Sequence, residues 1–265
     1  MIPALFTRDV RRSLPAAAAV FAVMALYVVC IVYMFNPETA KMLDDLMTYM
    51  PQLYDAFGMG HDTSTLTGFM LNYLYGFILT LLPLVLVLLV VNKLLVKPIA
   101  RGEFAWVLAS PHGRGPILGS VIAALASVLV LTLAAVHATE LASAVAFFPE
   151  DLDAGALLAV NAGLFCLWAF MAGACLLSAV AFAKRPGALW VGGGFCLVEF
   201  VIQMAAQLGD SLEGLKYATF FSLFDPYGIV AVSSDAVAGA VALLVGGVVL
   251  SVAALLVFRR RDLAL

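Results

Sequence analysis

Six long apolar stretches, separated by polar segments, run along the chain. We expect helices at residues 15–35, 68–91, 115–136, 154–182, 188–206 and 236–258. The hydrocarbon core of a bilayer is about 30 Å thick and takes roughly 20 helical residues to cross, close to the length of each stretch. Transmembrane β-strands would instead appear as alternating segments of about ten residues. The pattern therefore predicts an all-α integral membrane protein with six transmembrane helices.

Composition favours a single membrane domain over residues 1–265. Hydrophobic residues make up 64% of the chain and charged residues 12%, whereas soluble domains carry about 25% charged residues. Six helices leave no length for a sizeable soluble domain. The basic residues are scattered at the edges of the apolar stretches, which argues against nucleic-acid binding. This composition predicts that the chain is surrounded by membrane lipid.

Lysine and arginine are concentrated in alternate polar segments. Of the 14 Lys and Arg residues, only Lys41 and Lys216 lie in the other set. Cytoplasmic segments of membrane proteins carry an excess of Lys and Arg. This bias predicts that both termini are cytoplasmic and that the acidic segments 36–67 and 207–235 are external.

The first 14 residues mix apolar side chains with Arg8, Arg11 and Arg12. This mixture predicts a short amphipathic helix that lies on the inner membrane surface. The apolar stretch that follows is longer than the roughly 7–15 residues of a signal-peptide core. We therefore expect it to be retained as the first span.

The cytoplasmic segment 97–114 is longer than a simple turn between two helices. It carries Phe104 and Trp106 after the basic Arg101, and Pro111 then ends the helical pattern, because proline cannot continue the hydrogen-bond ladder. Two interpretations fit an amphipathic helix at this place. It could dock into a groove of a soluble partner, or it could rest on the lipid surface.

The stretch 102–114, GEFAWVLASPHGR, resembles the segment between spans two and three in permeases of the ABC-2 type. The family pattern there is roughly Gly-Thr-Leu-Glu-Trp-Leu-Leu-Ala-x-Pro-x-Ser-Arg. The matching positions are Gly102, Trp106, Leu108, Pro111 and Arg114. The ending at 258–263, with its basic run followed by Asp-Leu, also resembles the family, whereas Ser120 stands where a lysine is common.

This resemblance implies a membrane subunit of an ATP-binding cassette exporter in the bacterial inner or plasma membrane. Such a subunit pairs with a second permease, identical or related, and docks a separate cytosolic ABC ATPase that binds ATP and Mg²⁺. The residues that the resemblance assigns to this coupling are Arg101, Glu103, Phe104, Trp106, Pro111 and Arg114. The chain has no GxxxxGK[ST] phosphate-binding loop. We therefore expect neither enzymatic activity nor a cofactor in this chain.

Several polar side chains interrupt the apolar stretches. Glu199 lies midway along the fifth stretch, and Gln203 follows one turn later on the same helix face. A charged residue at the bilayer centre costs roughly 2.5–3.5 kcal/mol, so we expect Glu199 to face protein or water. It could contact cargo or a proton in the pathway, or it could form a hydrogen bond between helices.

His137 and Glu140 are also neighbours on one helix face, near the external end of the third stretch. Because solvation is easier there, a structural role is the expected one for both residues. Asn161, in the fourth stretch, is expected to join helices through a hydrogen bond.

Two other classes of function compete with an exporter subunit. An intramembrane enzyme would need a catalytic set, but GxSxG, HExxH and paired intramembrane Asp residues are absent from the sequence. The three His are far apart and the four Cys have no CxxC spacing, so no metal site is predicted. A proton-coupled secondary transporter with Glu199 as the proton carrier is the alternative, although the sequence shows no inverted repeat.

Overall fold

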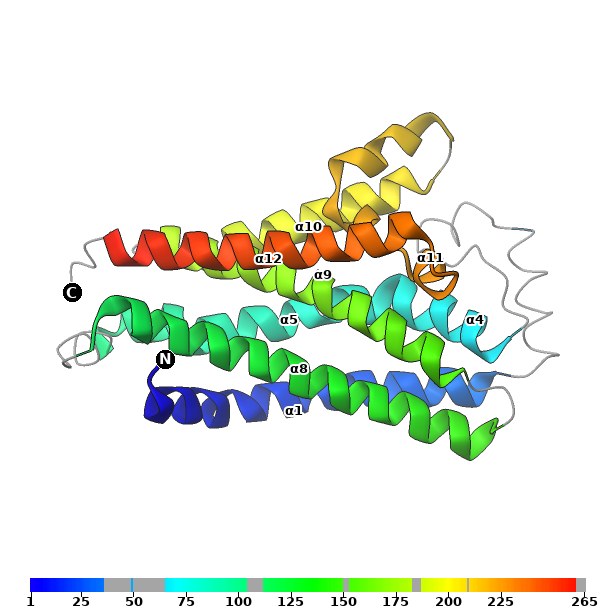
Figure 1. Ribbon diagram of the computed structural model, residues 1–265, viewed down its shortest axis with the longest axis horizontal. Coiled ribbons are helices and arrows are strands. Elements are labelled where there is room, and N and C mark those ends of the chain that lie inside the picture. The colour runs from blue at the N-terminus through cyan, green and yellow to red at the C-terminus, as the bar shows by residue number, and fades with distance from the viewer. Residues whose placement is uncertain are drawn as a thin grey trace.

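The computed structural model describes residues 1–35, 49, 65–103, 112–149, 153–182, 187–208 and 210–260. Within these ranges the chain is almost entirely helical and has no strand. In the described part of the chain, six helices are long and apolar enough to cross a membrane, as the sequence predicts, and they run side by side (Figure 1). They are α1 (Pro3–Met34), Leu66–Ala100, α8 (Arg114–Phe147), α9 (Ala154–Ala181), α10 (Ala188–Ala206) and α12 (Ser234–Arg260).

The second of these helices changes its winding along its length. In chain order it comprises α4 (Leu66–Met70), η1 (Leu71–Ile78), α5 (Leu79–Val91), η2 (Asn92–Val96) and α6 (Lys97–Ala100). Segments η1 and η2 are π-helical. Such segments are rare and occur mostly as local widenings, frequently at functional sites.

The start of α1 differs from the expected arrangement. Residues 1–14 were predicted to form a separate helix, but α1 runs without a break from Pro3 to Met34, with Pro15 inside it. A buried stripe with helical spacing passes through this point and includes Asp9, Ser13 and Ala17. Because the stripe packs against α8, tertiary contacts hold the helix together where proline removes one hydrogen bond. Contact of its first turns with the inner membrane surface stays a prediction.

Helix α9 occupies the centre of the bundle and packs against α12, α10, α5 and α8. Its closest neighbour is α12. A β-carbon on Gly173 would lie 2.7 Å from the carbonyl oxygen of Gly247, and one on Gly247 would lie 2.7 Å from the carbonyl carbon of Ala169. Small residues let membrane helices approach this closely.

A proline and a tryptophan together connect α9 to α5. Pro83 lies inside α5 and has no N–H, so the carbonyl of Leu79 loses its α-helical donor. The indole Nε1–H of Trp168 donates to that carbonyl at 3.0 Å, and Trp168 is fully buried. The bond satisfies a polar group that would otherwise be unpaired in an apolar interior.

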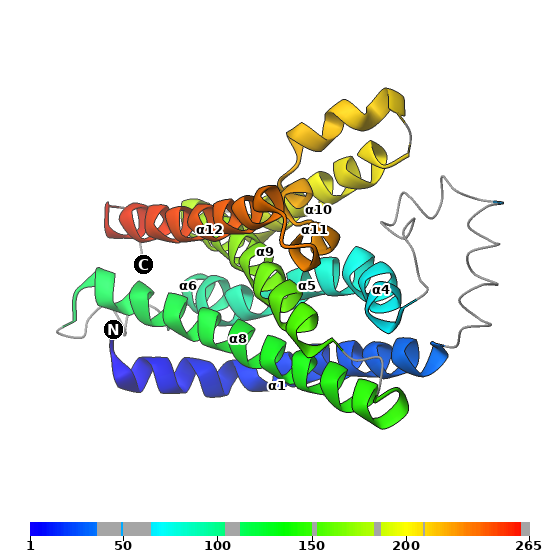
Figure 2. The ribbon, with the colours of Figure 1, turned by 45° about the vertical axis from the view of Figure 1, so that its right-hand side comes forward.

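The segment between α10 and α12 contains three short helices. They are η3 (Asp210–Ala218), η4 (Phe220–Leu223) and α11 (Pro226–Val230). Figure 2 shows η3 (gold) beside α10 and projecting from the bundle. Phe220 and Phe221 are buried and stack on each other, and α11 contacts α9, α12 and η1. The segment thus covers one end of the bundle.

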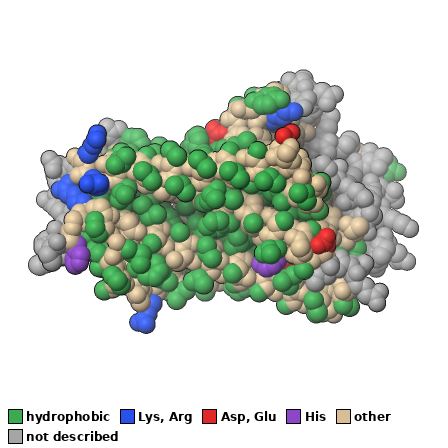
Figure 3. Space-filling view, viewed as in Figure 1, with side chains coloured by type: hydrophobic (Ala, Val, Ile, Leu, Met, Phe, Trp, Pro, Cys, Tyr) green, Lys and Arg blue, Asp and Glu red, His purple; other side chains and the backbone are tan. Residues whose placement is uncertain are grey.

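Arginines gather at the other end, which we call the basic end. There α1 begins, α6 ends, α8 begins and α12 ends (Figure 1). Figure 3 shows hydrophobic side chains over the middle of one face, with most of the visible Lys and Arg at this end. Its described arginines include Arg12, Arg101, Arg114, Arg259 and Arg260.

Candidate functional site

Four polar side chains meet inside the half of the bundle farther from the basic end. His137 and Glu140 project from one face of α8, Asn161 comes from the first turns of α9, and Tyr75 comes from the π-helical segment η1. We call these four residues the polar cluster. Three elements separated along the chain therefore converge on one carboxyl group.

Glu140 is the centre of the cluster. The hydroxyl of Tyr75 donates to its Oε1 at 2.9 Å, and Nδ2 of Asn161 donates to its Oε2 at 2.7 Å. Nδ1 of His137 lies 3.5 Å from the same Oε2. Nδ2 of Asn161 is also 2.8 Å from the Tyr75 hydroxyl oxygen and 3.1 Å from His137 Nδ1. A side-chain amide has two hydrogens, so it can serve only some of these acceptors at once.

The cluster is shielded from the surroundings except at the histidine. Glu140 is 0% exposed, while the side chain of His137 keeps 18% of its surface. A charge deep in a membrane costs roughly 2.5–3.5 kcal/mol, and a hydrogen bond to a charged group contributes about 1.5–3 kcal/mol. Two such bonds and a nearby imidazole are therefore enough to offset the burial of the carboxyl group.

The arrangement can hold a proton. A proton placed on His137 would give an ion pair with Glu140 across the 3.5 Å separation, and a proton on the carboxyl would remove its charge. Asn161 Oδ1 is buried and has no hydrogen-bond partner among the described residues. It therefore offers one unused acceptor next to the titratable pair.

A cavity of about 580 Å³ adjoins the cluster through Tyr75, which lines it. The cavity lies between the second helix, α10 and the segment that includes η4 and α11. Its lining combines aromatic and polar side chains, including Thr80, Phe200, Gln203, Lys216, Phe221, Asp225 and Tyr227. Such a mixture suits a ligand with an apolar body and a few polar groups.

Gln203 and Glu199 have different positions relative to this cavity. Gln203 lines it, and its Oε1 is buried without a hydrogen-bond partner among the described residues. Glu199 is half-buried and does not line the cavity. The hydroxyl of Thr219 donates to the backbone carbonyl of Glu199 at 2.9 Å, which attaches the covering segment to α10. A pathway role for Glu199 stays a prediction.

Glu140 of α8 is more buried within the bundle than the sequence suggested. The third span was expected to end at residue 136, with Glu140 in an easily solvated place, but α8 continues to Phe147 and Glu140 is fully buried. The helix extends because apolar residues continue beyond His137 and Glu140 is paired. Asn161 does join helices through hydrogen bonds, as predicted.

Tyr75 was not identified from the sequence. It lies in an apolar run that includes Asn72 and Tyr73, and hydrophobic spacing alone does not show which of them points inward. The π-helical winding of η1 changes that spacing. Asn72 does take part in a second contact, since its Oδ1 accepts a hydrogen bond from the Tyr227 hydroxyl at 3.2 Å. The signal in the sequence that could have indicated this part of the site is the presence of three polar residues, Asn72, Tyr73 and Tyr75, within four positions.

Half of the predicted coupling residues can be placed. Arg101, Glu103 and Arg114 lie at the basic end, whereas Phe104, Trp106 and Pro111 lie outside the described residues. Glu103 forms ion pairs with Arg101 at 3.6 Å and with Arg12 of α1 at 4.0 Å. All three side chains are substantially exposed, so each pair contributes little to stability, about 0–1 kcal/mol.

Three helix ends contact one another at the basic end. The N–H of Ile2 donates to the hydroxyl of Ser120 at 2.7 Å, which connects the N-terminus to α8. A β-carbon on Gly115 would lie 3.7 Å from Cδ of Arg259, so the end of α12 lies against the start of α8. The start of α1, the start of α8 and the end of α12 therefore meet at the basic end.

Comparison of the chain with protein-family models, curated proteins and solved structures finds no match.

Proposed function

We propose that this chain is the membrane-spanning permease subunit of an ATP-binding cassette exporter. It pairs with a second permease, identical or related, and is driven by a separate cytosolic ATPase. Six helices with the length and hydropathy of membrane spans support the membrane part of this proposal. The family resemblance of residues 102–114 supplies the type of transporter.

The observation that carries the proposal is the arrangement of the basic end. Glu103 and Arg114 flank the segment whose sequence resembles a coupling helix. Glu103 pairs with Arg12 of α1, and Arg114 lines the same pocket as Arg259 of α12. A partner that binds this segment would therefore contact α1, α8 and α12 together. Movement of one docked protein could in this way reach several spans, as a transporter without its own ATPase requires.

The polar cluster and the cavity have separate roles in this proposal. The cluster fixes η1, α8 and α9 to one another through Glu140. The cavity is the candidate contact for cargo, because Gln203 and the aromatic side chains face it. The expected cargo has an apolar body and at least one hydrogen-bond donor for Gln203 Oε1.

Co-purification tests the proposal. The tagged chain, isolated from its host membrane, should bring down a protein with ATPase activity. Trp106→Ala combined with Arg114→Glu should abolish that activity in the isolate while leaving the yield of inserted protein unchanged. Arg260→Glu, an exposed charge change at the same end, is the control and should retain it. Equal ATPase activity with and without the double substitution would reject the docking assignment.

A proton-coupled secondary transporter is the second candidate, and the buried His137–Glu140 pair is the observation that favours it. In this candidate Glu140 carries the proton. The sequence alone suggests Glu199 as the carrier instead. Vesicles that contain only this chain and an internal pH-sensitive dye provide the test under an imposed pH gradient. Proton flux that Glu140→Gln removes would support it, and absence of flux would exclude it.

A further inference from the structure

We infer that the cavity beside Tyr75 binds an uncharged aromatic compound with one N–H or O–H group, and that this group donates to Oε1 of Gln203. The inference deepens the cargo role of the cavity, and for that role it rests on the proposed function. The binding itself follows from three features of the lining: its aromatic rings, the partners of its charged and hydroxyl groups, and an unused acceptor.

Aromatic side chains from three parts of the chain line the cavity. Tyr75 comes from η1, Phe200 from α10, and Phe221, Phe224 and Tyr227 from the segment between α10 and α12. Phe200 and Phe221 meet edge to face, with their ring centroids 5.3 Å apart. Because aromatic rings favour edge-to-face and offset contacts with one another, a ring of the ligand can extend this arrangement. The volume of about 580 Å³ falls within the roughly 300–1,000 Å³ of known ligand pockets.

The charged side chains in the lining, Lys216 and Asp225, already have partners within the protein. Nζ of Lys216 lies 5.3 Å from the ring centroid of Tyr217. Oδ1 of Asp225 accepts from the backbone N–H of Gly228 at 2.9 Å and so caps α11. The two charges are also opposite in sign. A charged ligand would therefore lose its hydration without gaining a counter-ion of its own, which favours an uncharged one.

The hydroxyl groups in the lining are likewise engaged as donors. The hydroxyl of Tyr75 donates to Glu140, and that of Thr80 donates to the backbone carbonyl of Tyr75. The hydroxyls of Ser222 and Tyr227 also donate to acceptors of the protein. A ligand whose polar group is an acceptor would find each of these hydrogens already in use.

Oε1 of Gln203 differs from these groups. It is buried in the lining of the cavity and has no hydrogen-bond partner among the described residues. A buried acceptor without a partner is unfavourable, so a ligand that brings a donor to it gains a bond and removes that cost. A site of this kind discriminates against an analogue that lacks the donor.

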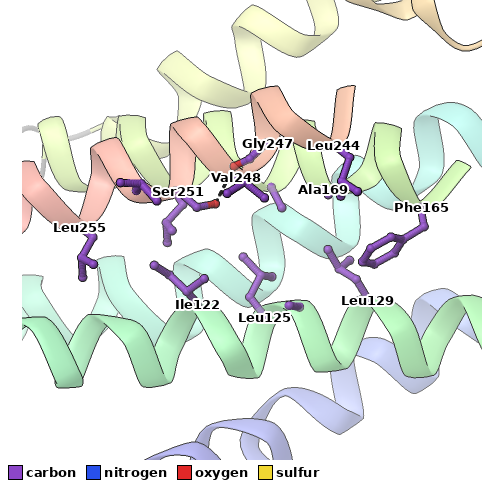
Figure 4. A pocket seen from close by; sticks show the side chains of 14 residues that line it. Ile122, Leu125, Leu129, Phe165, Ala169, Leu244, Gly247, Val248, Ser251 and Leu255 are labelled. Atoms are coloured by element: carbon purple, nitrogen blue, oxygen red, sulfur yellow. Dashed lines mark hydrogen bonds between the residues drawn. The ribbon is translucent and has the colours of Figure 1, made fainter. Parts of the chain in front are cut away.

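A hollow between α8, α9 and α12 provides a comparison within the same molecule (Figure 4). Its lining is largely apolar and includes Ile122 and Leu129 of α8 and Leu244 of α12. The hydroxyl of Ser251 donates to the carbonyl of Gly247 at 2.8 Å. The side chains of this hollow include no buried acceptor without a partner in the described part of the chain. An aromatic compound that entered it would gain nothing from an N–H group.

A matched pair of ligands tests the inference. N-phenyl-1-naphthylamine and 1-benzylnaphthalene share the same two ring systems, but the second has a methylene group in place of the N–H. Native mass spectrometry of the purified full-length protein in detergent measures the fraction that carries one ligand during titration with each. We expect saturable binding of one N-phenyl-1-naphthylamine, tighter than that of 1-benzylnaphthalene.

The acceptor is tested by two substitutions one turn apart on α10. Gln203→Met keeps the approximate shape of the side chain but removes the acceptor, and it should reduce the preference for the amine about five-fold, the effect of one hydrogen bond. Glu199→Met removes a polar group that does not line the cavity and should leave the preference unchanged.

A second set of variants tests the location. Met204→Trp fills the cavity and should weaken binding of the amine, whereas Val201→Trp, on the exposed face of α10, and Ser251→Phe, in the other hollow, should not. If Met204→Trp does not fold, judged by its melting in ligand-free detergent, the smaller Met204→Phe replaces it.

Three results would each overturn the inference: equal affinity for the two ligands, equal effects of Gln203→Met and Glu199→Met, or binding that Ser251→Phe weakens more than Met204→Trp does. No ATPase takes part in these measurements. Their failure would therefore remove this binding site without affecting the co-purification result that tests the proposed function.

Discussion

At the scale of single residues, a buried carboxyl group determines how three elements meet. Glu140 accepts hydrogen bonds from Tyr75 of η1 and from Asn161 of α9, and no part of it is exposed. Because each donor is also buried, none of the three can exchange its partner for water. Removal of the carboxyl group would leave the buried Tyr75 hydroxyl without its acceptor, whereas Asn161 Nδ2 would keep the Leu157 carbonyl at 3.0 Å.

Glu140→Leu should lower the free energy of unfolding by about 1–3 kcal/mol, since the buried Tyr75 hydroxyl loses its acceptor and one such unpaired group costs about that much. In a Tyr75→Phe background one of the two donors is gone, so the same substitution should cost about 1–2 kcal/mol less. Unfolding of the detergent-purified protein by a denaturing detergent measures both costs. Glu199→Leu is the matched control, because the described residues provide no hydrogen-bond partner for that side chain, and it should change stability by less than about 1 kcal/mol. Equal costs in the two backgrounds would contradict the cluster.

Trp168 offers a second test at this scale. Trp168→Phe removes the donor to the Leu79 carbonyl and should destabilise the protein by about 1–3 kcal/mol. Pro83→Ala restores an N–H that can bond that carbonyl within α5, so the cost of Trp168→Phe should fall by about 1 kcal/mol in this background. Trp190→Phe, on the exposed face of α10, should be nearly silent. A cost that does not depend on residue 83 would show that the indole acts by packing alone.

At the scale of elements, the hydrophobic pattern predicted more about the helices than about their contacts. The fifth span, 188–206, coincides with α10, and all six spans are present. The length of α8 and the continuity of α1 were missed because they depend on tertiary partners: Glu140 is paired by other elements, and Pro15 lies on a helix held against α8. The hydrophobic pattern along the sequence does not show which residues of other elements these residues contact.

The residues of the candidate site could likewise be predicted from the sequence only in part. Spacing alone placed His137 with Glu140, and Asn161 was expected to join helices. The position of Tyr75 required the π-helical winding of η1, which widens the helix and alters which side chains share a face. The cavity near Gln203 forms only because the segment after α10 folds back over it. Hydrophobic periodicity along the sequence does not predict that this segment folds back.

The close contact between α9 and α12 depends on glycine. A glycine-to-alanine substitution should therefore destabilise the protein at this contact and stabilise it at an open helical position. Gly247→Ala should destabilise the protein by about 1–3 kcal/mol, because the new β-carbon would meet the backbone of α9 at 2.7 Å. Gly194→Ala in α10 meets nothing within 4 Å and should stabilise by about 0.5–1 kcal/mol through helix propensity. Melting of the two variants in detergent measures the difference. Stabilisation by both would mean that α9 and α12 are not in close contact.

At the scale of the whole molecule, the two ends of the bundle differ in chemistry. One end gathers arginines from α1, α8 and α12, and the other holds the cavity beneath η4 and α11. This polarity, together with the distribution of Lys and Arg in the sequence, predicts that the basic end faces the cytoplasm. The cavity would then face outward, where an exporter releases its cargo.

Cysteine labelling in intact cells tests this orientation. In a Cys-free background, a cysteine in place of the exposed Asp225 should react with an impermeant thiol reagent, while one in place of the exposed Arg260 should react only after the cells are opened. Both sites lie outside the apolar parts of their helices, so accessibility to the reagent depends on the side of the membrane. The reverse pattern would invert the topology.

The central claim is that a cytosolic ATPase binds this chain through the segment between α6 and α8. Site-specific photo-crosslinking in cells tests it most directly, with a photoreactive amino acid in place of Trp106 and, as a control, in place of the exposed Tyr33 at the opposite end of α1. We expect a crosslink from position 106 to a protein that contains a GxxxxGK[ST] phosphate-binding loop, and none from position 33. Crosslinks from position 106 to lipid alone, or to the same proteins as from position 33, would contradict it.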